Sequence, residues 1–123
     1  MLTKEQILEA HDLEYRDEET PEWGGSVRLW QLTVSDRDAF EESISKLKPS
    51  GQAEIIRENF RAKLVARCLG DENGERLFSD KEIIQLGKKS AKVVDRLFVI
   101  CQELNGMSAE DEERFVKNSE GEG

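Results

Sequence analysis

One stretch, residues 23–40, constrains the fold most, because it joins a turn, a strand and a helix start without a spacer. Gly24-Gly25 allows positive φ at a turn, and residues 26–34 have the β-branched and aromatic composition of a strand. We therefore predict a hairpin in which residues 18–23 pair with this strand. Pro21 lacks an amide hydrogen and marks the earlier strand as an edge.

Helix start signals recur along the chain. At Ser35 the strand is predicted to give way to a helix, because its hydroxyl can accept from the amide of Asp38 and carboxylates favour the positive end of a helix. Thr3 and Gln6 form a capping box for a short first helix, about Lys4 to Ala10. The other predicted helices cover residues 52–69, a segment from Ser79 to Gly87, a segment from Ser90 to Asn105-Gly106, and a last acidic segment from Ser108.

These elements predict an α+β, mostly helical fold, with one β-hairpin packed with about five to six short-to-medium helices. At 123 residues the chain is long enough to bury a core without a metal or disulfide, and we expect one domain, residues 1–117. Residues 118–123 are polar and glycine-containing, which predicts a disordered acidic tail. No apolar run approaches the ~18 residues that span a bilayer, and no secretory signal is present, so we expect a cytoplasmic protein.

The net charge of −9 is unevenly distributed. Residues 1–25 hold 8 acids and 2 bases, and residues 110–123 hold 6 acids and 2 bases, whereas residues 26–109 hold 13 acids and 14 bases. Acidic ends repel polyanions, which argues against nucleic acid or an anionic membrane as a partner. A basic protein partner, or solubility assisted by charge, fits this distribution better.

The residues that catalysis and metal binding require are sparse. His11 is the single histidine and lies at the end of the first predicted helix, without a nucleophile beside it in the sequence. Cys68 and Cys101 fall on apolar helical faces, where a thiol behaves as a small hydrophobe. No cysteine or histidine pair has zinc spacing, and no phosphate-binding glycine motif occurs. We therefore predict no catalytic, cofactor-binding or metal-binding residues.

Two other charged patterns allow more than one interpretation. Residues 71–82 place oxygen-bearing side chains at several positions of a calcium-binding loop, but Arg76 stands where that loop requires glycine, so a turn leading into a capped helix is favoured. Leu77-Phe78 within it is predicted to anchor the chain to the core. A basic set forms either one patch on two helices or a solvated face, and consists of Arg57, Arg61, Lys63, Arg67, Lys88, Lys89 and Lys92.

An ordered series of short strings extends over nearly the whole chain. It consists of Pro-Glu-Trp-Gly-Gly-Ser-Val-Arg at 21–28, Leu-Thr-x-x-x-Arg-Asp-Ala-Phe-Glu at 32–41, Asn-Phe-Arg-Ala-Lys-Leu-Val-Ala-Arg-Cys-Leu at 59–69, Gly-Glu-Arg-Leu-Phe-Ser-Asp at 74–80, Leu-Gly-x-Lys-Ser at 86–90, Asp-Arg-Leu-Phe at 95–98 and Leu-Asn-Gly at 104–106. In order and spacing the series resembles the tail assembly chaperones of long-tailed (siphovirus-type) phages and prophages. It departs from that pattern at Trp30 and Gln31, where a more polar pair is expected.

The resemblance implies a non-enzymatic chaperone that binds the tape measure protein, keeps it soluble in the bacterial host cytoplasm during tail assembly, and is absent from the mature virion. It further implies self-association and a longer form, made by programmed frameshifting, that reaches the tail-tube subunit. Lys117-Asn118 can be encoded by a slippery AAA-AAC sequence near the end of the frame. For client contact we predict four apolar side chains, Trp23, Trp30, Phe115 and Val116.

Two other functions remain open at the level of sequence. The acidic chain could act as a small adaptor or inhibitor that occupies a basic surface of a host or phage protein, which salt-sensitive binding would reveal. A carboxylate-dependent metal hydrolase is the third reading, and it would require metal-dependent activity that is lost on changing Asp71 or Glu82.

Overall fold

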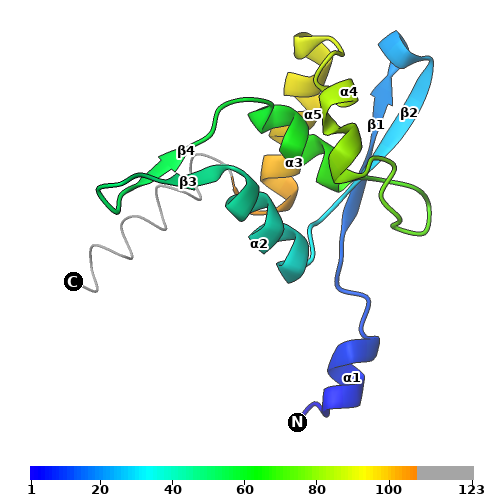
Figure 1. Cartoon of the computed structure of the whole chain (residues 1–123). Coiled ribbons are helices and arrows are strands. Elements are labelled where there is room, and N and C mark those ends of the chain that lie inside the picture. Colours follow the sequence, from blue (N-terminus) through cyan, green and yellow to red (C-terminus); the bar gives the residue numbers. More distant parts are fainter. Residues whose placement is uncertain (108–123) are drawn as a thin grey trace.

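The computed structural model describes residues 1–107, which form an α+β, mostly helical structure (Figure 1). Its main sheet is antiparallel, in the order β1 (Tyr15–Thr20), β2 (Gly25–Trp30) and β5 (Leu69–Gly70). The predicted hairpin is confirmed, with β1 at the edge as Pro21 indicated. Its strands are shifted from the prediction: β1 begins at Tyr15, and β2 ends at Trp30.

The turn of this hairpin explains why the predicted partner strand was placed too late. Residues Pro21–Trp23 form a 3₁₀ turn, and Gly24 follows with φ +81°, a value that favours glycine. The Thr20 hydroxyl donates a 2.7 Å hydrogen bond to the carbonyl of Gly25 and closes the turn. Because proline begins this turn, the first strand stops at Thr20 instead of continuing to Trp23.

Helix α2 (Val34–Ser43) begins earlier than predicted. Its N-cap is Thr33, whose hydroxyl accepts from the amide of Asp36 at 3.1 Å, so the assignment of Ser35 as the cap was wrong. The cause is tertiary: the side chain of Asn105 accepts from the amide of Leu32 at 2.7 Å, just after β2 has ended. The chain therefore leaves the sheet with Thr33 placed to cap the helix.

The prediction of one helix over residues 52–69 was wrong in its first half. A second antiparallel hairpin occupies this region, formed by β3 (Ser45–Leu47) and β4 (Ala53–Ile55), with Gly51 at φ +87° in the turn. Helix α3 (Phe60–Cys68) begins only after Asn59, which has φ +54°. Left-handed backbone at Asn59 interrupts any helix across that position, although the apolar spacing in the sequence continues through it.

The later helix signals are confirmed. The Ser79–Glu82 capping box opens a 3₁₀ turn (Asp80–Glu82) that leads into α4 (Ile83–Leu86), with Gly87 at its end. Helix α5 (Ala91–Leu104) follows N-cap Ser90, whose side chain makes no capping hydrogen bond, and ends before Gly106 at φ +64°. The predicted helix from Ser108, the boundary at residue 117 and the tail 118–123 lie outside the described residues and stay predictions.

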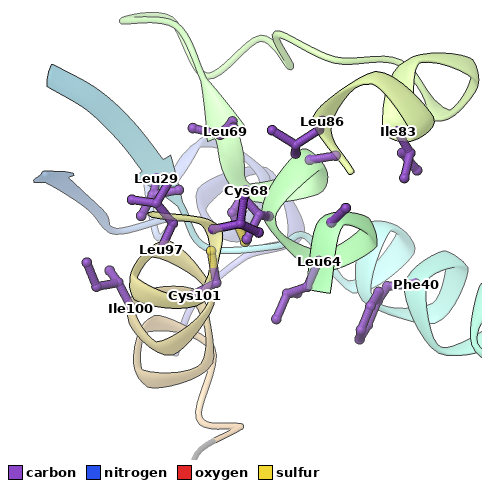
Figure 2. Close-up of a cluster of buried hydrophobic side chains, with 14 residues drawn as sticks. Leu29, Phe40, Leu64, Cys68, Leu69, Ile83, Leu86, Leu97, Ile100 and Cys101 are labelled. Atoms are coloured by element: carbon purple, nitrogen blue, oxygen red, sulfur yellow. The ribbon is translucent and has the colours of Figure 1, made fainter. Parts of the chain in front are cut away.

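The core lies where α3 and α5 pack together against β2 (Figure 2). Leu29, Leu64 and Leu97 are fully buried. Cys68 and Cys101 are buried free thiols, which confirms their use as small hydrophobes. Contact with Cys68 and burial raise the pKa of the Cys101 thiol, so it stays protonated.

Two segments outside the core, Leu77-Phe78 and α1, differ in how far they pack against it. Phe78 packs against the core as predicted, but Leu77 is 51% exposed, so the expectation that both residues anchor the chain was wrong for Leu77. Helix α1 (Lys4–Glu9) has both hydrogen bonds of the Thr3–Gln6 capping box, at 2.9 and 3.2 Å, yet none of its residues is buried. It projects from the rest of the described chain (Figure 1).

Candidate partner-binding surfaces

The outer part of the main hairpin carries an ordered aromatic and charged cluster. The Arg28 guanidinium lies 3.9 Å from the centre of the Tyr15 ring, and Tyr15 contacts Trp30 with ring centroids 4.8 Å apart. Arg28 also donates two hydrogen bonds to Asp17, at 2.7 and 3.0 Å, which lower the pKa of that carboxyl group. Cross-strand pairing within the hairpin accounts for these contacts.

Trp30, predicted as a client contact, has a role inside the molecule. Its indole N–H donates to the carbonyl of Asp71 at 3.0 Å. The ring lies so close to Gly70 that an added Cβ there would stand 2.7 Å from Trp30 Cδ1. Trp30 therefore holds the loop that follows β5, while part of its surface remains exposed.

Of the other three predicted client contacts, only Trp23 lies within the described residues. Trp23 is partly buried and packs against the core from the hairpin turn. Phe115 and Val116 lie outside the described residues. The structure thus brings Trp23 and Trp30 onto the same hairpin, but their part in partner binding stays a prediction.

Arg96 of α5 fixes the tip of that hairpin. Its guanidinium donates to Glu22 at 2.9 and 3.0 Å and to the carbonyl of Glu19 at 3.3 Å. Hydrogen bonding from Arg96 lowers the pKa of Glu22 to about 2. Trp23 is therefore carried on a turn that is tied to the helical layer.

The predicted basic set does not form one solvated face. Arg67 is 7% exposed, with its guanidinium between Asp36 at 3.6 Å and Asp80 at 3.2 Å. Lys63 donates to the carbonyl of Ser43 at 2.9 Å, and Arg61 pairs with Asp95 at 3.0 Å. These three cations are engaged within the structure.

Other members of the basic set line a groove of mixed apolar and charged lining between α3 and α5, with a volume of about 580 Å³. Arg57 and Lys89 stand with Arg61 among its lining residues. Its apolar part includes Phe60, Val94, Phe98 and Leu86, and Ile55 of β4 contributes from the second hairpin. Sequence reasoning found the cations but missed the groove, because it treated residues 52–59 as helix.

Apolar side chains are also exposed on the two projecting elements. In and beside α1, Leu2 and Leu8 are 74% and 75% exposed. On the second hairpin, Leu47 is 72% and Ile55 59% exposed. Each element is short and depends on few tertiary contacts, so these side chains are available to a partner.

The loop considered for calcium is organised by its own hydrogen bonds. The Asp71 carboxylate accepts from the amides of Asn73 and Glu75 at 2.8 and 3.0 Å, and Arg76 reaches Asp80 at 3.1 Å. Across residues 1–107 no group of three or more His, Cys, Asp and Glu side chains is placed to hold a metal ion. In the same range no helix combines the length and apolar character needed to cross a bilayer.

An α+β body thus displays a groove with apolar and basic lining and two projections with exposed apolar side chains. The family model of the phage tail assembly chaperones matches residues 4–115, and the chain belongs to this family. Among solved structures it is similar to the tail assembly chaperone of bacteriophage HK97, with 20% identity over 81% of this chain and 94% of that one and a TM-score of 0.55. None of the curated proteins compared with the chain matches it.

Proposed function

We propose that this chain is a non-enzymatic chaperone that binds a phage tape measure protein and keeps it soluble in the host cytoplasm until tail tube subunits assemble around it. The observation that carries this proposal is the family match over residues 4–115. The protein would then leave, so that it is absent from the mature virion. The similarity to the HK97 protein supports the fold on which this proposal is built.

The surface chemistry supports the proposal. A long helical client with apolar stripes aggregates unless those stripes are covered, and the exposed apolar residues of this chain could cover them. The net charge of −9 would make coated clients repel one another. Many copies along one client would therefore raise its solubility.

The test is co-expression with the tape measure gene of the phage or prophage that encodes this chain. We expect the client to be insoluble alone and to be recovered as a soluble complex with this chain. A client that stays insoluble with the chaperone, or that is soluble without it, would refute the proposal. Turnover of a small molecule by the purified protein would refute its non-enzymatic part.

The predicted client contacts Trp23, Trp30, Phe115 and Val116 belong to this proposal. Trp23→Ala is the informative change, and Phe78→Ala is its matched control, because both aromatic rings are partly buried against the core. If Trp23 contacts the client, Trp23→Ala lowers the amount of co-purified client more than Phe78→Ala does at equal loss of thermal stability. Equal losses would assign Trp23 a structural role alone.

Self-association and a frameshifted longer form that reaches the tail-tube subunit complete the proposal. The longer form requires a slippery nucleotide sequence across Val116 to Asn118 and an open overlapping frame downstream. Other codons there, with no overlapping frame, would exclude it.

A further inference from the structure

Helix α1 projects from the rest of the described chain (Figure 1). The chain is attached to the body at Glu14 by two hydrogen bonds of 2.9 Å. The Glu14 backbone amide donates to the side-chain oxygen of Gln31, and the Gln31 backbone amide donates to the carbonyl of Glu14. Residues 10–13 line surface pockets together with the body, whereas residues 1–9 form a projecting arm, in which α1 has a complete capping box and no buried residue. Isolated helices shorter than about 12 residues are marginal in water, so six residues of helix need a surface to pack on.

The arm has a defined chemistry. Met1, Leu2, Ile7 and Leu8 are its exposed large apolar side chains. Glu5 and Glu9 are one helical turn apart in α1 and give it a negative side. A surface on which this arm packs must therefore be apolar and carry positive charge alongside.

The groove between α3 and α5 has that complementary chemistry. Phe60, Val94 and Phe98 supply apolar lining, and Arg57 and Lys89 supply positive charge. The acidic lining residue Asp95 is paired with Arg61 at 3.0 Å. Within residues 1–107, neither Arg57 nor Lys89 takes part in an ion pair. A volume of about 580 Å³ is within the range of sites that hold several apolar groups.

We propose that α1 of one copy docks in the α3–α5 groove of a second copy of this chain. The inference deepens the proposed self-association and rests on it. The pairing matches the acidic carboxylates Glu5 and Glu9 to the cations Arg57 and Lys89 while Ile7 and Leu8 enter the apolar part. This one interface would cover the exposed apolar side chains of α1 and give the cations of the groove carboxylate partners.

The geometry of the chain favours a second copy over the arm's own groove. Glu14 is joined through Gln31 to the carbonyl of Leu104, at one end of α5, whereas the groove meets α5 at residues 91–98. None of the residues of α1 is buried and none lines this groove, so within one copy the arm leaves its own groove open.

An interface between two different surfaces leaves a free arm at one end of a dimer and a free groove at the other. Copies therefore add head to tail. The contact of one short helix is small, so assembly should depend on protein concentration, and its charged part should weaken as salt screens it.

The test is sedimentation velocity of the full chain over a range of concentrations, with two variants. The arm variant is Ile7→Asp with Leu8→Asp, and the groove variant is Arg57→Glu with Lys89→Glu. Each is expected to weaken self-association by about tenfold or more. An equimolar mixture should form a dimer and stop there, because only one intact arm and one intact groove can meet.

Two controls make the result specific. Leu77→Asp alters an exposed leucine outside both surfaces and should assemble as the wild type does. Glu5→Lys with Glu9→Lys should weaken assembly with the wild-type groove and restore it with the groove variant. Circular dichroism checks that every variant is folded.

A wild type that stays monomeric at all concentrations, or a mixture of arm and groove variants that does not dimerise, would overturn the inference. An arm variant that assembles normally but loses the client would overturn it too, since the arm would then be a client contact. Failure of the proposed function has a different signature, because the client would stay insoluble even with wild-type protein that self-associates.

Discussion

The body of the molecule and its two projections differ in what holds them together. In the body, β2, α3 and α5 contribute fully buried leucines, such as Leu29, Leu64 and Leu97. In the projections, α1 and the β3–β4 hairpin have no buried residue and rest on local hydrogen bonds. Since burial is the dominant favourable contribution to folding, the stability of the fold rests mainly on the body, and the projections keep exposed apolar side chains.

The largest expected change in the free energy of unfolding comes from a substitution in the body, and the same kind of substitution in a projection should have almost no effect. Leu97→Ala removes a fully buried side chain from α5 and should lower the free energy of unfolding by about 2–5 kcal/mol. Leu8→Ala, in exposed α1, should change it by less than about 0.5 kcal/mol. Urea denaturation of monomeric protein at low concentration measures both. Similar losses for the two variants would mean that α1 is packed on the body.

Gly70→Ala probes the sheet edge of the body, where Trp30 lies against β5. The new methyl group would meet Trp30 Cδ1 at 2.7 Å, and we expect a loss of about 1–3 kcal/mol in the free energy of unfolding. Trp30→Leu removes the obstructing ring, so the double variant should lose less than the sum of the two single variants. Additive losses would show that the contact with Trp30 is not the cause.

Local signals explain how much of the fold the sequence predicted. The Thr3 and Ser79 capping boxes, the stop at Gly106 and the glycine turn of the first hairpin act within a few residues, and the structure has all of them. The start of α2 was misplaced because the side chain of Asn105, far along the chain, determines where β2 ends. The second hairpin was missed because apolar spacing on both sides of Asn59 imitates a continuous helix.

The candidate surfaces were less predictable for the same reason. Sequence reasoning identified Arg57 and Lys89 as members of a basic set, but their meeting beside Phe98 depends on how α3 and α5 pack. The burial of Arg67 between Asp36 and Asp80 likewise depends on three separate segments. One visible signal was available: Leu2, Ile7 and Leu8 lie in a strongly acidic segment with a capping box, which suggests an apolar helix with little to pack on.

A smaller effect is expected at the junction between β2 and α2. Thr33→Ala removes the hydroxyl that accepts from Asp36 and should cost about 1 kcal/mol in the free energy of unfolding. Ser35→Ala, two residues later in the chain, should cost much less because Ser35 is not the cap. Urea denaturation of the pair compares them under one set of conditions. A larger loss for Ser35→Ala would place the cap where the sequence alone suggested it.

The smallest effect concerns the exposed tie between the hairpin tip and α5. Arg96 holds the pKa of Glu22 at about 2, below its ordinary value of 4.5. A carboxyl group whose folded pKa is lowered stabilises the fold above its unfolded pKa and loses that contribution as the pH falls toward the folded value. The contribution of Glu22 should therefore be complete above pH 4.5 and decline between about pH 4.5 and 2.

Glu22→Gln tests this linkage. The wild type should be slightly more stable than the variant at pH 6, and the difference should shrink as the pH is lowered toward 3 and as salt is added, because exposed pairs are screened. Glu42→Gln, at an exposed position of α2, is the matched control and should follow the wild type in parallel. A wild-type advantage that grows on acidification would have the opposite sign. It would mean that Arg96 does not hold the hairpin tip through the Glu22 carboxylate, and that packing of Trp23 against the core fixes the turn instead.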